Sequence, residues 1–249
     1  MQPYVTLQIK NKVGYIEFFH PDHNAMPSAN LKKLVQFIRE AGSNKMVKVV
    51  VLKSGGDRTF CAGASFKELI AIDNEVKGTQ FFSGFAQVIN AMRECPKLII
   101  ARVQGKAVGG GVGLAAAADY CLATQYAAIK LSELSIGIGP FVIEPVVSRR
   151  MGKTAMSRLT LDAETFYTPE WAKEKGLYAE VYDSAEALDE AIQDMAQKLC
   201  GYNSEALEQM KQVFWEGTDH WNELLLERSK ISGKLVLSAF TKEKLKRFK

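Results

Sequence analysis

Five glycines between residues 104 and 114 constrain this chain more than any other feature. The segment reads QGKAVGGGVGL, and it lies between an apolar, β-branched run at 98–103 and helix-forming residues at 114–118. Glycines at a helix start leave N–H groups exposed, which favours a bound phosphate or a developing oxyanion. The spacing excludes the phosphate motifs, because a dinucleotide fingerprint needs glycine at Leu114 and a P-loop needs lysine at Gly111. An oxyanion site is therefore favoured, with close helix–strand packing as the alternative.

A second glycine-containing turn, at 59–69, reads TFCAGASFKEL and follows another buried strand at 47–52. Strands and helices alternate through this half of the chain, which predicts a largely parallel sheet with crossover helices. Both turns then open at the carboxyl edge of the sheet, where ligands bind. One N–H group from each turn would form an oxyanion hole that polarises a carbonyl and stabilises an enolate. We expect Ala64 and Gly110 to supply these donors.

Hydrophobic spacing predicts the remaining elements. Alternation on both sides of an Asn11-Lys12 turn predicts an N-terminal hairpin, and helices are expected at 28–42, with Ser28 as the N-cap, and at 74–92. Beyond residue 150 we expect helices and one short strand at 179–182. Asp183 and Glu186 resemble a capping box at the first of these later helices. We divide the chain into a core at 1–195 and a helical region at 196–249.

Composition narrows the class of protein. The chain has 249 residues, 47% of them hydrophobic and 24% charged, with a formal net charge of +4. One globular domain with a large core is expected, and no apolar stretch is long enough to span a bilayer. We expect a cytoplasmic protein. The four cysteines have no C-x-x-C spacing and only three histidines occur, so buried thiols are expected and a metal site is not.

Four motifs read HPDHNAM at 20–26, AGASFKE at 62–68, GGGVGLA at 109–115 and ADY at 118–120. Together they resemble the crotonase (enoyl-CoA hydratase/isomerase) superfamily. The resemblance implies an α/β fold, a crotonase-like ββα spiral with a C-terminal helical trimerisation region, assembled as a homotrimer or hexamer. It implies an acyl-CoA substrate and no separate cofactor, since coenzyme A is part of the substrate. No nucleic acid, membrane or metal partner is expected.

The resemblance also assigns site residues. The thioester carbonyl would lie between the N–H groups of Ala64 and Gly110, which makes the adjacent carbon acidic. Glu133 would be the catalytic carboxylate. The remaining substrate contacts are expected at Ala25, Ala62, Ser65, Phe66, Lys67, Gly109 and Phe141.

One expected carboxylate is missing. Family hydratases use two glutamates, and the corresponding positions here are Gly113 and Glu133. Two carboxylates can hold a water molecule, whereas one can move a proton between carbons of the same substrate. The segment 131–141 is similar to the mitochondrial-type Δ3,Δ2-enoyl-CoA isomerases, which favours isomerisation through Glu133.

Three alternatives stay open at this point. One is an enoyl-CoA hydratase, including one for a branched enoyl-CoA, in which Glu133 works alone or with Glu144. Another is a non-catalytic acyl-CoA-binding or RNA-binding member of the same fold, because Gly113 lacks the acid. The last concerns Glu144, which either substitutes for the missing acid or makes only a structural contact, whereas Asp119 is expected to be structural.

Overall fold

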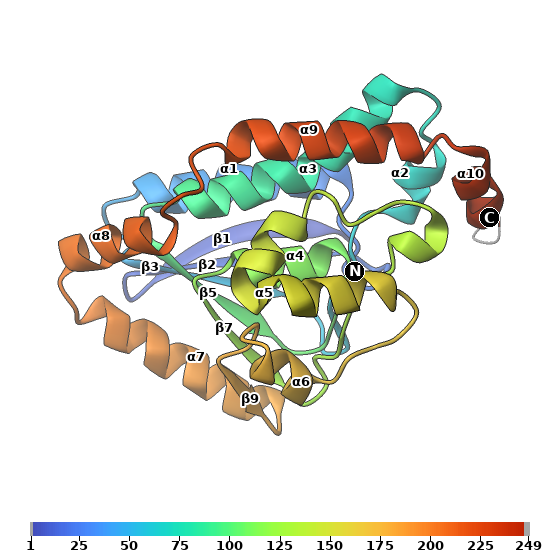
Figure 1. The fold of residues 1–249 in the computed structure, drawn as a ribbon. Coiled ribbons are helices and arrows are strands. Elements are labelled where there is room, and N and C mark those ends of the chain that lie inside the picture. The colour runs from blue at the N-terminus through green and yellow to red at the C-terminus, as the bar shows by residue number, and fades with distance from the viewer. Residues whose placement is uncertain (1, 247–249) are drawn as a thin grey trace.

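A computed structural model describes residues 2–246, in which strands and helices alternate until helices dominate the last third (Figure 1). The strands are β1 (Tyr4–Lys10), β2 (Val13–Phe19), β3 (Val49–Ser54), β4 (Thr59–Cys61), β5 (Leu98–Val103), β6 (Lys106–Val108), β7 (Tyr120–Thr124), β8 (Ile129–Lys130) and β9 (Glu180–Tyr182). The helices are α1 (Ser28–Ser43), α2 (Phe66–Ile70), α3 (Glu75–Glu94), α4 (Gly110–Ala117), the 3-10 helix η1 (Leu134–Ile136), α5 (Glu144–Leu161), α6 (Pro169–Glu174), α7 (Ala185–Cys200), α8 (Ser204–Phe214), α9 (Trp221–Leu235) and α10 (Ala239–Leu245).

The larger sheet has the strand order β1-β2-β3-β5-β7-β9. The β1–β2 pair is antiparallel and its turn places Asn11 and Lys12 at φ values of 50° and 66°, so the predicted hairpin is confirmed. The other neighbouring pairs in this sheet are parallel, as the alternating pattern predicts. Their carboxyl ends therefore meet at one edge.

A second, three-stranded parallel sheet, β4-β6-β8, was not predicted. Strands β3, β5 and β7 of the larger sheet each lead into one of these short strands and then into helical structure. This repeat makes up the ββα spiral implied by the resemblance. At the switch from β5 to β6 the chain passes close to the loop after β3, since a Cβ added to Gly105 would lie 2.7 Å from the carbonyl carbon of Arg58.

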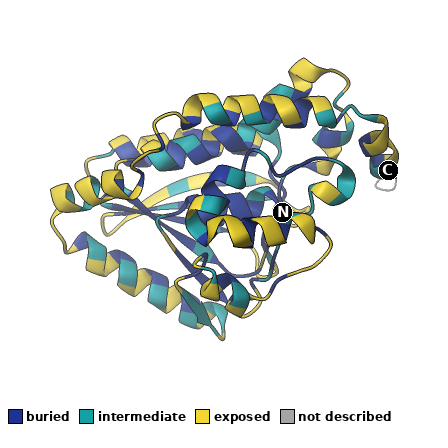
Figure 2. Ribbon diagram, viewed as in Figure 1, coloured by how far each residue is buried: buried dark blue, intermediate teal, exposed yellow. Residues whose placement is uncertain are grey.

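The strand side chains alternate between two cores, one on each face of the larger sheet. Val49 and Val51 pack in a small cluster with apolar residues of α7, while Val50 and Leu52 belong to the main core with residues of α1, α3 and α4. Figure 2 shows buried residues through the sheet and exposed residues on the outer faces of α7 and α9. The two cores fix the carboxyl ends of the strands between helical layers.

The C-terminal helices pack on the core at two points. Helix α9 lies along α3 (Figure 1), and a Cβ added to Gly78 would lie 2.6 Å from the carbonyl oxygen of Gly233. Helix α8 is held by the buried carboxylate of Asp119, which accepts hydrogen bonds from Lys211 Nζ at 2.6 Å and Trp215 Nε1 at 2.9 Å. Asp119 thus makes structural contacts, as predicted. The predicted boundary after residue 195 falls within α7, and the last three residues of the helical region, 247–249, lie outside the described residues.

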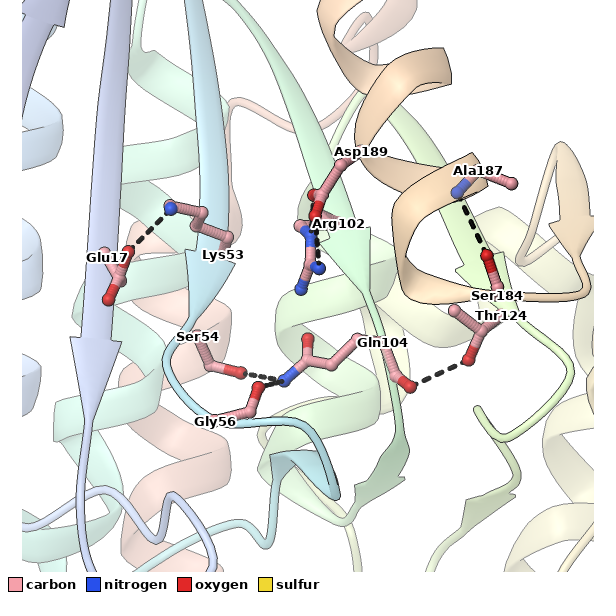
Figure 3. A network of polar contacts seen from close by, with 10 residues as sticks. All are labelled: Glu17, Lys53, Ser54, Gly56, Arg102, Gln104, Thr124, Ser184, Ala187 and Asp189. Atoms are coloured by element: carbon pink, nitrogen blue, oxygen red, sulfur yellow. Dashed lines mark hydrogen bonds and ion pairs between the residues drawn. The ribbon is translucent and has the colours of Figure 1, made fainter.

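Two predicted helix caps are wrong. Ser28 is the first residue of α1 rather than its N-cap, and its backbone N–H and hydroxyl donate to the carboxylate of Glu68, with Ser28 Oγ 2.6 Å from Glu68 Oε2. At α7 the cap is Ser184, whose Oγ accepts from the N–H of Ala187 at 3.2 Å (Figure 3). At α7 the observed cap lies one residue after the predicted one, whereas the observed cap of α1 is Pro27, whose side chain makes no cap hydrogen bond.

A buried amide positions the loop between β3 and β4. Gln104 Nε2 donates to Ser54 Oγ at 2.9 Å and to the carbonyl of Gly56 at 3.2 Å, while Thr124 Oγ1 donates to the carbonyl of Gln104 at 2.7 Å (Figure 3). Asn24 Nδ2 donates to the carbonyls of Gly55 and Thr59, both at 2.8 Å. The chain is therefore fixed on both sides before it enters the second glycine-containing turn.

The predicted state of the cysteines is confirmed, since Cys61, Cys95, Cys121 and Cys200 are all free and buried. Burial raises the pKa of the Cys61 and Cys121 thiols to about 12, which keeps them protonated and unreactive. Among the helices of residues 2–246, none combines the length and apolar character needed to cross a membrane.

Candidate active site

The two glycine-containing turns meet at one pocket, as predicted. The pocket has a volume of about 90 Å³ and is lined by both turns, by one face of α3 and by the segment 132–143. A Cβ added to Gly63 would lie 3.5 Å from the backbone nitrogen of Gly110, so the turns touch each other. Gly63 and Gly109 have φ values of +87° and +53°, a region that favours glycine.

The N–H groups of Ala64 and Gly110 are free to bind a ligand. Gly110 is the first residue of α4, where the helix itself offers no acceptor, and Ala64 precedes the short helix α2. Over residues 2–246, neither group donates to another atom of the chain. Two free donors beside an apolar pocket can polarise a carbonyl oxygen that enters it.

Glu133 presents a carboxyl group to the same pocket. The residue is half-buried, but its Oε2 atom is closed to solvent and has no hydrogen-bond partner among the described residues. This burial raises the pKa of the Glu133 carboxyl from 4.5 to about 7. A Cβ added to Gly109 would lie 2.8 Å from Glu133 Oε1, so the carboxyl rests against the backbone next to the Gly110 N–H. Near neutral pH such a group can both take up and release a proton.

Packing excludes a second carboxylate from position 113. A Cβ added to Gly113 would lie 2.5 Å from Ile143 Cγ2 and 3.0 Å from Ile143 Cβ, so no side chain fits there without displacing that residue. Glu144 does not line the pocket and makes structural contacts instead. It accepts a hydrogen bond from Ser148 Oγ at 2.7 Å and faces Arg228 at 3.9 Å. Among the residues that line the pocket, Glu133 is the one ionisable group.

The structure brings only part of the predicted set together. Ala62, Ala64, Phe66, Gly109, Gly110, Glu133 and Phe141 line the pocket. Ala25, Ser65 and Lys67 do not. Ala25 is buried in the segment before α1, Ser65 caps α2 by accepting from the N–H of Glu68 at 3.4 Å, and Lys67 is exposed. The segment of Ala25 still borders the turn, because the Met26 N–H donates to the carbonyl of Gly63 at 2.8 Å.

Sequence reasoning missed the apolar walls of the pocket. Phe81, Phe82 and Phe85 come from α3, and Ser232 comes from α9. The three phenylalanines carry a helical signal, but periodicity alone does not separate a core face from a pocket wall. Phe85 lies directly against Gly110, where any Cβ would overlap its ring.

A larger, open hollow adjoins the pocket beside Ala62 and Val108. It has a volume of about 720 Å³, and its polar and aromatic lining includes His23, Arg58, Lys106 and Tyr126. Next to it, Lys106 Nζ and Lys130 Nζ lie 4.9 and 5.1 Å from the ring centre of Phe166. Of these two adjoining hollows, the small pocket is apolar and the larger one is basic and aromatic.

Comparison with known proteins decides the family. A family model described as Enoyl-CoA hydratase/isomerase matches residues 8–247. The chain belongs to the enoyl-CoA hydratase/isomerase family. The expected α/β crotonase fold is confirmed by a crystal structure of an enoyl-CoA hydratase from Bacillus halodurans, which superposes with a TM-score of 0.90 at 20% identity over 98% of this chain and 99% of the other.

Relatives in this family carry both reaction names. A short-chain-enoyl-CoA hydratase from Clostridium acetobutylicum is 28% identical over 86% of this chain and 81% of its own length. A peroxisomal Δ(3,5)-Δ(2,4)-dienoyl-CoA isomerase from Arabidopsis thaliana is 27% identical over 91% of each chain. The family relationship therefore indicates an enoyl-CoA hydratase/isomerase family enzyme and does not separate the two reactions.

Proposed function

We propose that this family member is an enoyl-CoA isomerase that uses Glu133 as its single acid–base group. The thioester oxygen accepts hydrogen bonds from the N–H groups of Ala64 and Gly110, and Glu133 removes a proton from C2 of a 3-enoyl-CoA. The negative charge spreads over a dienolate whose oxygen stays between the two donors. Glu133 then returns the same proton to C4, which leaves the double bond between C2 and C3. No atom is gained or lost.

The observation that carries this proposal is the closure of position 113 by Ile143. Hydration needs a group that deprotonates water and a group that protonates the substrate carbon, and two carboxylates divide that work well. Here the pocket holds one ionisable side chain, Glu133, in apolar surroundings that leave its pKa near neutral. A single group of that kind suits a proton that leaves and returns to the same molecule.

The basic hollow supports an acyl-CoA as the substrate. Arg58 and Lys106 line it together with the carboxylate of Asp57, and Lys130 lies nearby, so three cations outnumber one anion where phosphate groups could bind. The exposed rings of Tyr126 and Phe166 offer faces on which a base can stack. Coenzyme A as part of the substrate requires no further cofactor.

Hydration of a 2-enoyl-CoA is the second candidate function, favoured by the hydratase name of the relative from Clostridium acetobutylicum. In that reaction Glu133 would have to deprotonate water and supply the proton to C2 by itself.

Separate incubations with a 3-enoyl-CoA and a 2-enoyl-CoA test the proposal. The absorbance of the conjugated thioester is followed in both. We expect it to rise with the 3-enoyl substrate, since isomerisation creates the conjugated bond. A fall with the 2-enoyl substrate and no rise with the other would establish hydration instead. No change in either, with acyl-CoA binding retained, would identify a binding protein without catalysis.

The pH dependence should follow the ionisation of Glu133. Because the base must be deprotonated in the free enzyme, kcat/KM for a 3-enoyl-CoA should rise with pH and level off above the Glu133 pKa of about 7. The profile is measured from pH 5 to pH 9. A profile whose rise centres near pH 4.5, or that is flat across the range, would contradict this assignment.

We propose that the chain assembles as a homotrimer or a hexamer through its helical region. Apolar side chains of that region stay exposed on the single chain, among them Met210, Val213, Phe214, Leu226 and Ile231. Sedimentation equilibrium at micromolar concentration measures the assembled mass. A stable monomer would overturn this assembly.

A further inference from the structure

Phe81 separates the acyl pocket from a second hollow on the surface. It lines the small pocket of about 90 Å³ and also lines an open hollow of about 440 Å³ between α1, α2 and α3. The Phe81 side chain is buried, with 8% of the residue exposed, and it belongs to a cluster with Leu69 and Ile138. Its neighbour Phe82 lines the small pocket but not the open hollow. The rings of Phe81 and Phe82 meet edge-on, with their centroids 5.1 Å apart.

The volume of the pocket limits what fits in front of Phe81. An apolar protein cavity of about 150 Å³ holds benzene, which has six carbons, whereas this pocket has about 90 Å³. At the same cavity volume per carbon atom, a chain of about four carbons fills this pocket. Beyond Phe81 the hollow is wide and reaches solvent, with Ile72, Gln80 and Lys32 among its lining residues.

We propose that Phe81 is the residue that restricts this enzyme to short acyl chains, and that its removal joins the pocket to the hollow between α1, α2 and α3. The proposal rests on the proposed acyl-CoA function. A longer chain would pass the position of the ring, keep its first carbons in the apolar pocket and extend its end through the hollow toward solvent. Chain length would then be set by one side chain on α3, and the residues that perform the chemistry would be untouched.

The test compares Phe81→Ala and Phe81→Leu with the control Val236→Ala, which changes the same apolar cluster but lines neither hollow. For each protein the ratio of kcat/KM for a ten-carbon to a four-carbon enoyl-CoA is measured, since a ratio is insensitive to the folded fraction. We expect the parent to favour four carbons by at least tenfold, both Phe81 variants to raise the ratio at least tenfold, and Val236→Ala to change it less than threefold. Phe81→Leu keeps most of the packing and remains informative if the alanine variant does not fold.

Calorimetric binding of butanoyl-CoA and decanoyl-CoA separates the two possible failures. Binding of butanoyl-CoA by the parent and a gain in decanoyl-CoA affinity in the Phe81 variants support the proposal whichever reaction is catalysed. Binding of butanoyl-CoA without that gain, or a parent that binds both equally, overturns the role of Phe81 alone. If neither thioester binds, the proposed function falls as well.

Discussion

Replacing Glu133 with glutamine is expected to lower kcat by about a hundredfold or more while acyl-CoA affinity stays near the parent value. Glutamine preserves the shape of the side chain and its fit against Gly109, but it cannot accept the proton from C2. Steady-state kinetics with the best 3-enoyl-CoA gives kcat, and calorimetry with a saturated acyl-CoA gives the affinity. Both measurements are needed, because a misfolded protein loses both quantities.

The same substitution should stabilise the protein at high pH. A buried carboxyl whose pKa rises from 4.5 to about 7 favours the protonated native state, so the free energy of unfolding falls as pH rises through that interval. The loss amounts to about 3 kcal/mol once the group is fully ionised. Glu133→Gln removes the ionisation, so denaturant unfolding at pH 8 should show a more stable variant. A variant that is inactive and equally or less stable would contradict the burial of this charge.

Glu144→Gln is the matched control. It makes the same chemical change at the residue after Ile143, outside the pocket lining, where the carboxylate accepts from Ser148 and faces Arg228. We expect its kcat to stay within about twofold of the parent value. Near-normal turnover by Glu133→Gln together with a large loss in Glu144→Gln would reverse the two roles and end the single-glutamate mechanism.

Gly110→Pro should lower kcat/KM by a further hundredfold or more relative to Gly110→Ala, in line with the removal of one oxyanion donor, which costs about 10²–10³. Both variants place a Cβ against the Phe85 ring, so both suffer that packing change. Only proline lacks the N–H, and the first position of a helix tolerates it well. The comparison therefore isolates the donor, and far-ultraviolet circular dichroism confirms that α4 persists in both.

Equal activity of the two Gly110 variants would remove that N–H from the oxyanion hole. Attention would then move to the N–H of Gly111, the next residue of α4, although its position against the carbonyl of Cys61 leaves less room for a ligand.

The features that the sequence predicts correctly are those with a local physical cause. Asn11 marks the hairpin because asparagine enters the left-handed region more readily than most residues, and the glycine turns mark the pocket because Gly63 and Gly109 hold positive φ values that favour glycine. Glu133 follows from family spacing, and its burial then accounts for its pKa. The hairpin and turn signals lie within a few residues of their structural effects, whereas the signal for Glu133 is its spacing from the glycine segment.

The features that it misses depend on contacts far apart in the chain. Strands β4, β6 and β8 have only two or three residues each, too few for any periodicity to appear. Ser28 bonds Glu68, forty residues away, so a local capping rule places the wrong residue. Ile143, thirty residues downstream, fills the space beside Gly113, and no sequence pattern around Gly113 indicates this contact.

Because Ser232 of α9 forms part of the pocket wall, the pocket is completed late in the synthesis of the chain on the ribosome. Glu133 and both glycine turns are synthesised before residue 134, whereas Ser232 of α9 follows 99 residues later. At about 5–20 residues per second, synthesis of these residues takes about 5–20 s. For that time the nascent chain contains Glu133 but lacks the pocket wall that α9 contributes. During that interval Phe81 and Phe82 face water, so the newborn chain exposes an apolar surface that its own last helices later cover.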